Sequence, residues 1–318
     1  MDPRPSIPER GAPSAGAPPT TGTTGTTGTS GRGLRPLGLR SPRSAGYVPL
    51  WVKSHYSFLE GTSSPEELAT QAHALGLGAM AMTDRDGVYG LVKAHFAARE
   101  RGLRLICGAE LTITHGDPRR TSPGAQTRSA KLDSRTRVVA LVHDQEGYAQ
   151  LCQLISMGQA RAPKGQSLLH PHELAALTHC ELLCADPTLL AALRPLPVRV
   201  SAYCVRHLVA EERETERRLR QEAHALGLPV VGGFEVLYHH PERRALQDVV
   251  ACVRAGVTLS AAGTVIRSNA EHALLDPAVA QQRFADAPEL LRRSLHVAER
   301  CAFSLSQLDY RYPEEARP

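Results

Sequence analysis

The chain has 318 residues, of which 42% are hydrophobic and 22% are charged, and its formal net charge is +5. This composition excludes a fibrous or wholly disordered protein, because it supplies enough apolar side chains for a large buried core. Residues 1–46 contain six arginines against only Asp2 and Glu9, so this segment carries +4 of the charge and the other 272 residues carry +1. The part expected to fold therefore has no overall attraction for nucleic acid.

The seven cysteines are scattered, and most lie in apolar runs, which is typical of reduced, buried thiols. Cys180 and Cys184 form the closest pair, but no second pair stands at the spacing of a metal site, so we expect them to pack in the core. The sequence has no run of 18 apolar residues and no signal peptide. We therefore expect a cytoplasmic protein that does not associate with a membrane.

Residues 1–46 are rich in Gly, Pro, Thr and Ser, a composition that predicts a disordered tail. From Val48 onward, short apolar runs alternate with helical patterns. The polar segment 115–134 interrupts this alternation and predicts a mobile surface loop. The apolar runs predict strands at 79–83, 103–113, 137–143, 197–203 and 229–233.

Helices are predicted between these strands, and the first has a clear start signal. Ser64-Pro-Glu-Glu67 is a capping box with proline at the first helical position, so a helix should begin there and end before Gly76. The other helical patterns cover 88–101, 146–157, 211–227 and much of the chain from Pro241 to 303. Alternating strands and helices predict a parallel sheet.

A β/α barrel is favoured over an open nucleotide-binding sheet, because no GxGxxG motif follows the first strand and no GxxxxGK[ST] motif occurs. Several segments, in order, then resemble one family. The similarity is to the N-terminal PHP (polymerase and histidinol phosphatase) domain of bacterial DNA polymerase III alpha subunits, and most closely to the error-prone alpha-like polymerases. The segments that resemble it are 48–68, 74–111, 141–156, 160–165, 237–256 and 268–315.

The resemblance implies an α/β fold, with a distorted seven-stranded, TIM-like β/α barrel over residues 47–257. It also implies a helical C-terminal extension over residues 258–318, leading toward a polymerase core that is absent from this chain. Family members carry a cluster of His and carboxylate ligands at the strand ends. This cluster holds up to three metal ions and, in active members, hydrolyses phosphoesters.

The positions aligned with these ligands retain carboxylates but no histidine. Trp51 and Lys53 stand in place of a His-x-His pair, and Arg85 in place of the histidine of Thr-Asp-His. The full set is Trp51, Lys53, Glu60, Arg85, Glu110, Arg137, Glu235 and Leu237. Ammonium and guanidinium groups have no lone pair to donate and repel a metal cation. We therefore expect that the ancestral Zn²⁺, Mn²⁺ or Mg²⁺ site is lost, that no cofactor is bound and that none of these residues is catalytic.

Two interpretations of the substituted cations stay open. Lys53, Arg85 and Arg137 could pair with the three glutamates in a salt-bridge cluster that replaces the metals, because unpaired buried charges are costly. Alternatively, loss of function has relaxed the site and the arginines point into solvent. A rescue by His55, two residues beyond Lys53 and on the same face of a strand, would restore only one ligand.

The resemblance and the lost ligands together predict a function. We expect a stand-alone PHP-domain protein that acts as a metal-free structural or interaction module in DNA replication or damage-induced repair synthesis. Its partner would be a separately encoded polymerase core or another replication or repair protein, so that DNA is contacted only indirectly. The alternatives are a metal-dependent phosphoesterase or 3′–5′ proofreading exonuclease, and a degenerate gene fragment without a partner.

Overall fold

The computed structural model describes residues 46–114 and 135–309. The expected disordered tail, apart from Gly46, and the expected loop at 115–134 lie outside these ranges. The chain divides into two units, residues 1–36 and 37–318, and all of the described residues belong to the second.

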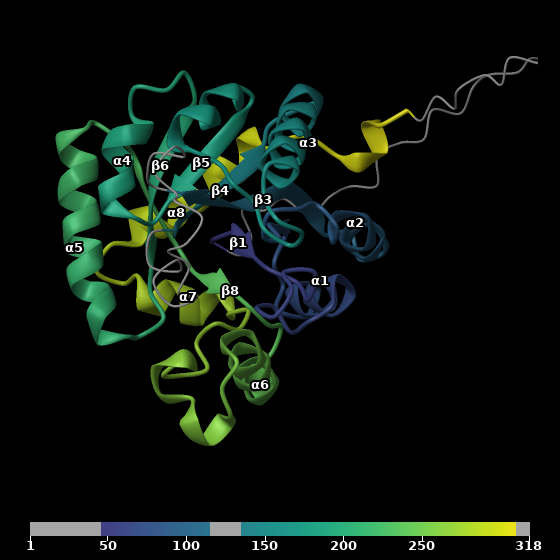
Figure 1. Cartoon of the computed structure of the whole chain (residues 1–318), viewed down its shortest axis with the longest axis vertical. Coiled ribbons are helices and arrows are strands. Elements are labelled where there is room, and N and C mark those ends of the chain that lie inside the picture. The colour runs from purple at the N-terminus through teal and green to yellow at the C-terminus, as the bar shows by residue number, and fades with distance from the viewer. Residues whose placement is uncertain (1–45, 115–134, 310–318) are drawn as a thin grey trace, which may run out of the picture. The chain divides into compact units, whose positions relative to one another are not determined.

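Eight strands in the described residues form two sheets (Figure 1). The larger sheet has six strands in the order β2-β3-β4-β5-β6-β7, and the smaller sheet pairs β1 with β8 in parallel. The strands are β1 (Trp51–Val52), β2 (Ala79–Met82), β3 (Arg104–Thr114), β4 (Arg135–Val142), β5 (Cys180–Cys184), β6 (Arg199–Val205), β7 (Val230–Gly233) and β8 (Glu235–Val236).

The prediction of a wholly parallel sheet is wrong at β4. This strand is antiparallel to β3 on one side and to β5 on the other, whereas β2–β3, β5–β6 and β6–β7 are parallel. A strand buried on both faces is an apolar run whichever way it points, so its sequence pattern does not reveal its direction. The short strand β5 was not predicted at all.

The α/β class is confirmed, and the six-stranded sheet curls into half a barrel. The predicted seven-stranded barrel is not confirmed, because the strands divide between sheets of six and two. The two sheets are nevertheless linked. The Thr83 N–H of the segment after β2 donates to the Val52 carbonyl of β1 at 2.8 Å, and only Phe234 separates β7 from β8.

The first predicted helix start is confirmed. The Ser64 hydroxyl accepts the Glu67 N–H at 3.1 Å and the Glu67 carboxylate accepts the Ser64 N–H at 2.8 Å, so α1 begins at Pro65 with its first amides satisfied. The helices are α1 (Pro65–Ala74), α2 (Leu91–Glu100), α3 (Gln145–Ala160), α4 (Pro187–Leu193), α5 (Ala210–Ala225), α6 (Arg244–Ala255), α7 (Pro277–Arg283) and α8 (Pro288–Arg300).

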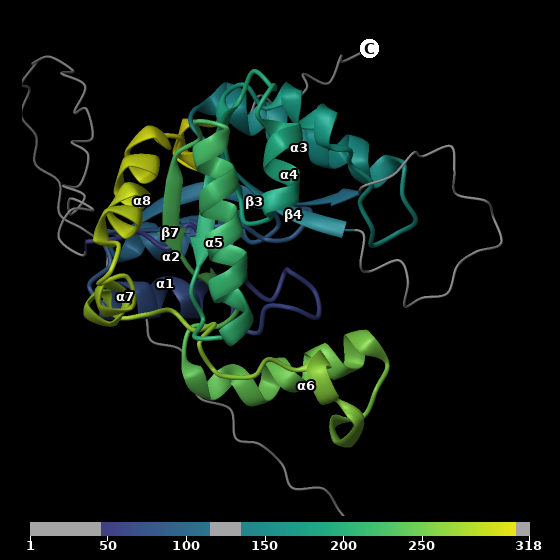
Figure 2. The ribbon, with the colours of Figure 1, turned by 90° about the vertical axis from the view of Figure 1, so that its left-hand side faces the viewer.

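Helix α8 packs against the sheet beside β7 (Figures 1 and 2). Its Ser294 hydroxyl accepts the Val48 N–H at 2.9 Å, and Val297 and Ala298 lie in a core cluster with residues of β1 to β7. The expected helical C-terminal extension is therefore not confirmed as a separate element, because α8 completes the core. Cys180 and Cys184 are buried free thiols in β5, as predicted.

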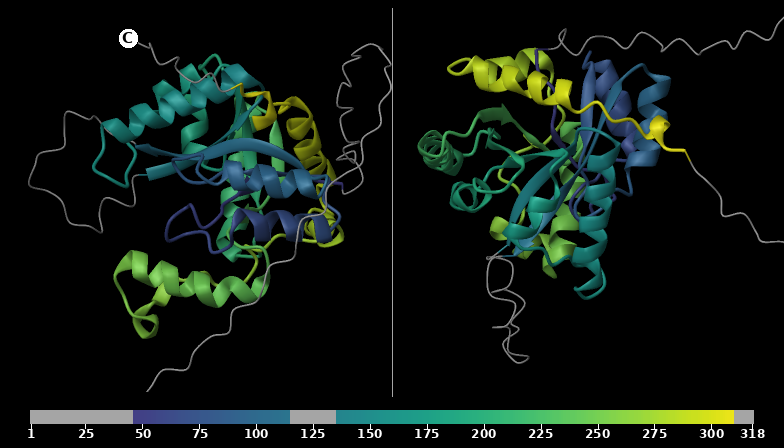
Figure 3. Two further views of the ribbon diagram at one scale, coloured as in Figure 1. Left: turned by 90° about the vertical axis from the view of Figure 1, so that its right-hand side faces the viewer. Right: turned by 90° about the horizontal axis from the view of Figure 1, so that it is seen from above.

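Helix α6 and the short turns that follow it stand at one end of the described domain (Figures 2 and 3). Its exposed side chains include Leu246, Val249 and Val253, at the helical spacing of three and four residues. Of the residues on α6, only Gln247 and Cys252 are buried. An apolar face of this helix is thus left uncovered. No helix within residues 46–114 and 135–309 is long and apolar enough to cross a membrane.

Candidate functional site

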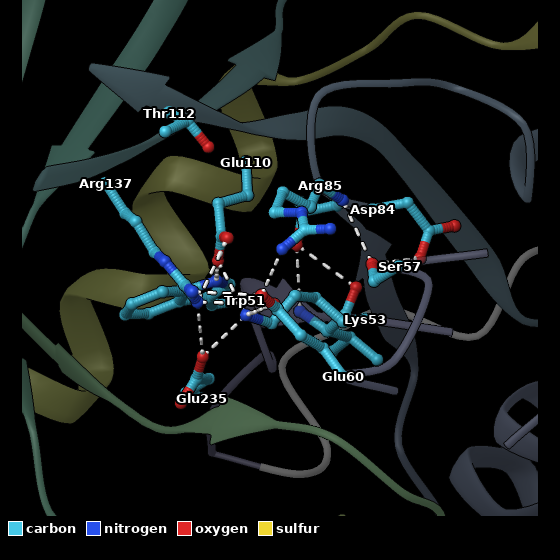
Figure 4. Close-up of polar contacts among 12 residues, drawn as sticks. Trp51, Lys53, Ser57, Glu60, Asp84, Arg85, Glu110, Thr112, Arg137 and Glu235 are labelled. Atoms are coloured by element: carbon cyan, nitrogen blue, oxygen red, sulfur yellow. Dashed lines mark hydrogen bonds and ion pairs between the residues drawn. The ribbon is translucent and has the colours of Figure 1, made fainter. Parts of the chain in front are cut away.

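Lys53 lies at the centre of a cluster of ion pairs (Figure 4). Its side chain has no exposed surface, and its N–H donates to the Val236 carbonyl at 2.9 Å, which fixes the residue beside β8. Its Nζ lies 2.6 Å from Glu235 Oε1, 2.8 Å from Glu110 Oε2 and 3.0 Å from Glu60 Oε2. One buried ammonium therefore contacts all three carboxylates.

The three glutamates come from separate parts of the fold. Glu110 lies within β3, Glu235 begins β8 and Glu60 lies in the turn after β1. The turn is tight at Gly61, where a Cβ atom would lie 2.1 Å from the Ser54 carbonyl oxygen. The backbone therefore directs all three carboxylates toward the same interior point.

Trp51 supports this arrangement from β1. Its Nε1–H donates to Glu110 Oε2 at 2.6 Å, and its ring centroid lies 5.5 Å from the Lys53 Nζ. A cation above an indole ring gains a favourable electrostatic contact. Trp51 therefore contacts both charges of the Lys53–Glu110 pair.

Arginines surround the glutamates on the side nearer to solvent. Arg85 Nη1 lies 2.5 Å from Glu60 Oε1, and Arg137 lies 2.9 Å from Glu60 and 3.3 Å from Glu110. The Arg85 and Arg137 side chains are 20% and 30% exposed, so they are partly buried rather than directed into solvent.

Sequence reasoning missed two further arginines of this cluster. Arg254 of α6 pairs with Glu60, and Arg267 Nη2 lies 3.1 Å from Glu235 Oε2. Nothing in the sequence pattern distinguishes them from the chain's many other arginines. Their position depends on how the segment after β8 folds back over the sheet.

The ion pairs outweigh the cost of burial. Burial alone would raise the pKa of Glu60, but Lys53 and Arg137 hold that pKa well below its usual range. The pKa of Glu235 is likewise held low against burial, by Lys53 and Arg267. Burial would lower the pKa of Lys53, yet Glu110 and Glu235 raise it. Glu60, Glu235 and Lys53 are therefore charged at neutral pH.

A pair of histidines outside the eight aligned positions lies next to Glu235. His272 stacks on His207 with ring centroids 3.9 Å apart, and burial lowers the pKa of His272 to about 3. The His207 Nε2 accepts the Glu235 N–H at 2.9 Å, while its Nδ1 lies 2.8 Å from the Glu212 carboxylate. The His272 Nδ1 lies 3.1 Å from the Glu235 carbonyl oxygen, so both rings hold the backbone of β8 in place.

Leu237 takes no part in the ion pairs. It is buried against Tyr238 and Ala273 and contributes no polar group. His55 is exposed, and its ring lies 4.7 Å from that of Tyr56 with the two planes tilted. Strand β1 ends at Val52, so the alternation of a strand does not carry His55 to the side of Lys53.

Asp84 and Asp86, which flank Arg85, are bound by hydroxyl and amide groups. Asp84 is buried and accepts hydrogen bonds from Ser54 and Ser57, whereas Asp86 accepts from the Thr112 N–H and hydroxyl. Burial raises the pKa of both carboxyls. Their contacts are those of residues that brace turns.

These side chains do not suit a metal ion. The Lys53 ammonium already occupies the point where the three carboxylates meet, and it repels a second cation. No group of three or more His, Cys, Asp or Glu residues in the described ranges is arranged to hold a metal. We therefore derive no reaction step through a metal at this site.

Comparison with known proteins identifies the domain. Residues 50–195 match the PHP domain family. The chain contains a PHP domain. An error-prone DNA polymerase 1 of Agrobacterium fabrum is 34% identical over 278 residues, which cover 85% of this chain and 24% of that protein. An error-prone DNA polymerase of Anaeromyxobacter dehalogenans is 36% identical over 280 residues, which cover 84% of this chain and 23% of that protein.

The chain thus spans about a quarter of the length of the curated relatives it matches. Among solved structures, an amidohydrolase from Chromobacterium violaceum is 14% identical. The superposed part covers 59% of this chain and 87% of the amidohydrolase chain. The TM-score is 0.41, which is a likeness too weak to bear on the site. The predicted relationship to the PHP domain of error-prone polymerases is confirmed.

Replacing the central cation should destabilise the PHP domain strongly. Lys53→Met keeps much of the side-chain volume but removes the fully buried cation that contacts all three carboxylates, so we expect the free energy of unfolding to fall by about 3–5 kcal/mol at pH 7. Lys93→Met is the matched control, because the Lys93 side chain is 53% exposed and lies 3.9 Å from Glu66. It should cost less than ~0.5 kcal/mol. Urea denaturation measures both.

The cost of Lys53→Met should also depend on pH. In the parent protein, Glu60 and Glu235 have lowered pKa values, so their stabilisation is complete above ~4.3 and is lost only as pH falls through the folded values. Without Lys53, only the arginines oppose the effect of burial, so these pKa values rise and the folded variant takes up a proton at a higher pH than the parent does. The cost should therefore be smaller at pH 5 than at pH 7. An equal cost at both pH values would contradict the proposal that Lys53 keeps these buried glutamates ionised.

Proposed function

We propose that this PHP domain is a metal-free structural and interaction module in DNA replication or repair synthesis, and that its partner is a polymerase polypeptide. None of the site residues acts as a catalyst in this proposal. The glutamates that align with metal ligands serve to anchor Lys53 and the arginines. The ion pairs hold the strand ends together, as metal coordination would.

Lys53 is the observation that carries the proposal. Its ammonium lies 2.6–3.0 Å from three carboxylates and has no exposed surface. A metal ion could bind these carboxylates only if the Lys53 ammonium moved away from them. That movement is costly, because the side chain is fully buried and its charge would lose its ion pairs without gaining water. The remaining arginines would still repel the ion. The domain is therefore held together without a metal.

The partner is proposed from the relatives and from α6. The relatives are named error-prone DNA polymerases, and this chain matches about a quarter of their length. The polymerase part of such a protein is the natural candidate to pack on this domain. The exposed Leu246, Val249 and Val253 of α6 offer it an apolar surface, of the kind that marks protein–protein contacts.

Metal content tests the proposed role directly. Protein incubated with Zn²⁺ or Mn²⁺ and then desalted should carry substoichiometric metal and hydrolyse neither a phosphomonoester nor single-stranded DNA, because the donor set lacks imidazoles and contains Lys53. Elemental analysis and a hydrolysis assay measure this. Stoichiometric, tightly held metal would contradict the proposal and favour a metal-dependent phosphoesterase or exonuclease.

A designed variant provides the converse control for the metal test. Trp51→His, Lys53→His, Arg85→His and Leu237→His together restore imidazoles at four aligned positions. Metal uptake by this variant alone would show that the assay detects a site on this scaffold and that the parent side chains prevent binding.

The partner surface can be tested with a single charge. The Val253 side chain is 61% exposed, so Val253→Glu should leave the melting temperature unchanged and weaken association by about tenfold or more. The assay uses the Anaeromyxobacter dehalogenans polymerase, from which the quarter that this chain matches has been deleted. Calorimetry measures its affinity for each variant. Val279→Glu, at a position on α7 that is 40% exposed, should bind normally. Absence of binding by the parent, or equal binding by Val253→Glu, would contradict the proposed surface.

A further inference from the structure

A cavity with an excess of arginines lies beside the ion-pair cluster. It has a volume of about 350 Å³ and is enclosed by the Leu59–Glu60 turn, by α6 and by residues 264–267. Its charged walls are Arg137, Arg254, Arg267 and Glu60. The cavity therefore presents three guanidinium groups and a single carboxylate.

Glu60 does not neutralise these arginines, because it is shared with other cations. Lys53 and Arg85 also contact it, at 3.0 Å and 2.5 Å. In the whole cluster five cations face three carboxylates, namely Lys53, Arg85, Arg137, Arg254 and Arg267 against Glu60, Glu110 and Glu235. The Asp86 carboxylate, which accepts two hydrogen bonds from Thr112, offsets part of the charge of the neighbouring Arg85 but does not line the cavity. Positive charge is left in excess at the cavity.

The arginines can be reached by a ligand. The side chains of Arg254 and Arg267 are 32% and 42% exposed. Arg254 pairs with Glu60 through Nη1, and Arg267 pairs with Glu235 through Nη2, so each guanidinium has further N–H groups to offer. Burial lowers the pKa of Arg254, and the neighbouring Arg85 and Arg137 lower it further against the effect of Glu60. This is the electrostatic environment of a cation that lacks sufficient counter-charge.

Apolar side chains form much of the remaining wall, including Leu59, Leu237, Val265 and Ile266. Such a wall limits the water that screens the arginines and so strengthens their attraction for an anion. A guanidinium matches the geometry of an oxyanion, to which it can donate two parallel hydrogen bonds.

We propose that this cavity binds a small, doubly charged oxyanion through direct contacts with Arg254 and Arg267. The two charges of the ligand match the excess of three guanidinium groups over one carboxylate in the cavity walls, and no metal ion takes part. The site needs no polymerase partner, so it goes beyond the module role proposed above. A bound anion would stiffen the junction between α6, the Leu59–Glu60 turn and residues 264–267.

Inorganic phosphate is the probe for this site. The full chain, stripped of metal with a chelator and then desalted, should bind phosphate saturably in calorimetry against a background of sodium chloride at matched ionic strength. Arg254→Gln and Arg267→Gln should each weaken binding by about tenfold. Arg217→Gln is the matched control and should bind normally, because Arg217 lies on α5, is 57% exposed and pairs with Glu214.

Each outcome of this experiment decides the proposal. Saturable binding that both cavity variants weaken and the Arg217 variant retains would support it. No saturable binding, or equal binding by all variants, would overturn it. Binding by protein that has not been treated with the chelator, but not by the stripped protein, would overturn it as well and would separately contradict the metal-free role. Using two cavity variants covers the case in which one of them unfolds, which circular dichroism would reveal.

Discussion

Three carboxylates meet at one interior point of this domain, and the fold requires a positive charge there. Lys53 supplies it from the residue that follows β1, with its Nζ within 3.0 Å of Glu60, Glu110 and Glu235. Without that charge, mutual repulsion and burial would act on all three glutamates together. The ammonium thus stabilises the same arrangement that a metal ion would, by contacting carboxylates from one turn and two strands.

The same residue joins the two sheets, because its ammonium contacts Glu110 of β3 and Glu235 of β8. Its backbone N–H extends the pairing of β1 with β8 by donating to Val236, while Val52 just before it accepts from the Thr83 N–H after β2. The turn that follows then carries Ser54 and Ser57 to Asp84. Asp84 lies against the start of α2, where a Cβ atom on Gly90 would be 2.3 Å from its Oδ2. The ion pairs and the strand-end geometry are consequently parts of one structure, and a change at Lys53 should affect both.

The sequence predicted what depends on local pattern or on aligned motifs. The capping box of α1, the α/β class, the burial of Cys180 and Cys184 and the relationship to PHP domains could all be read from it. The direction of β4 could not, because an apolar strand has the same pattern in either direction. Arg254 and Arg267 also could not be foreseen, since their contacts with Glu60 and Glu235 arise only when the segment after β8 folds back. The exposure of the apolar face of α6 could not be predicted either. An amphipathic helix ordinarily buries that face, and only the tertiary structure shows that it is uncovered.

The central claim, that an ammonium and not a metal lies among the three carboxylates, can be tested by anomalous diffraction. Crystals grown with Mn²⁺ or Zn²⁺ would be measured at the absorption edge of the added metal. We predict no anomalous peak within coordination distance of Glu60, Glu110 and Glu235, with density for the Lys53 Nζ between them. A strong peak there, with Lys53 turned away from the carboxylates, would contradict this account.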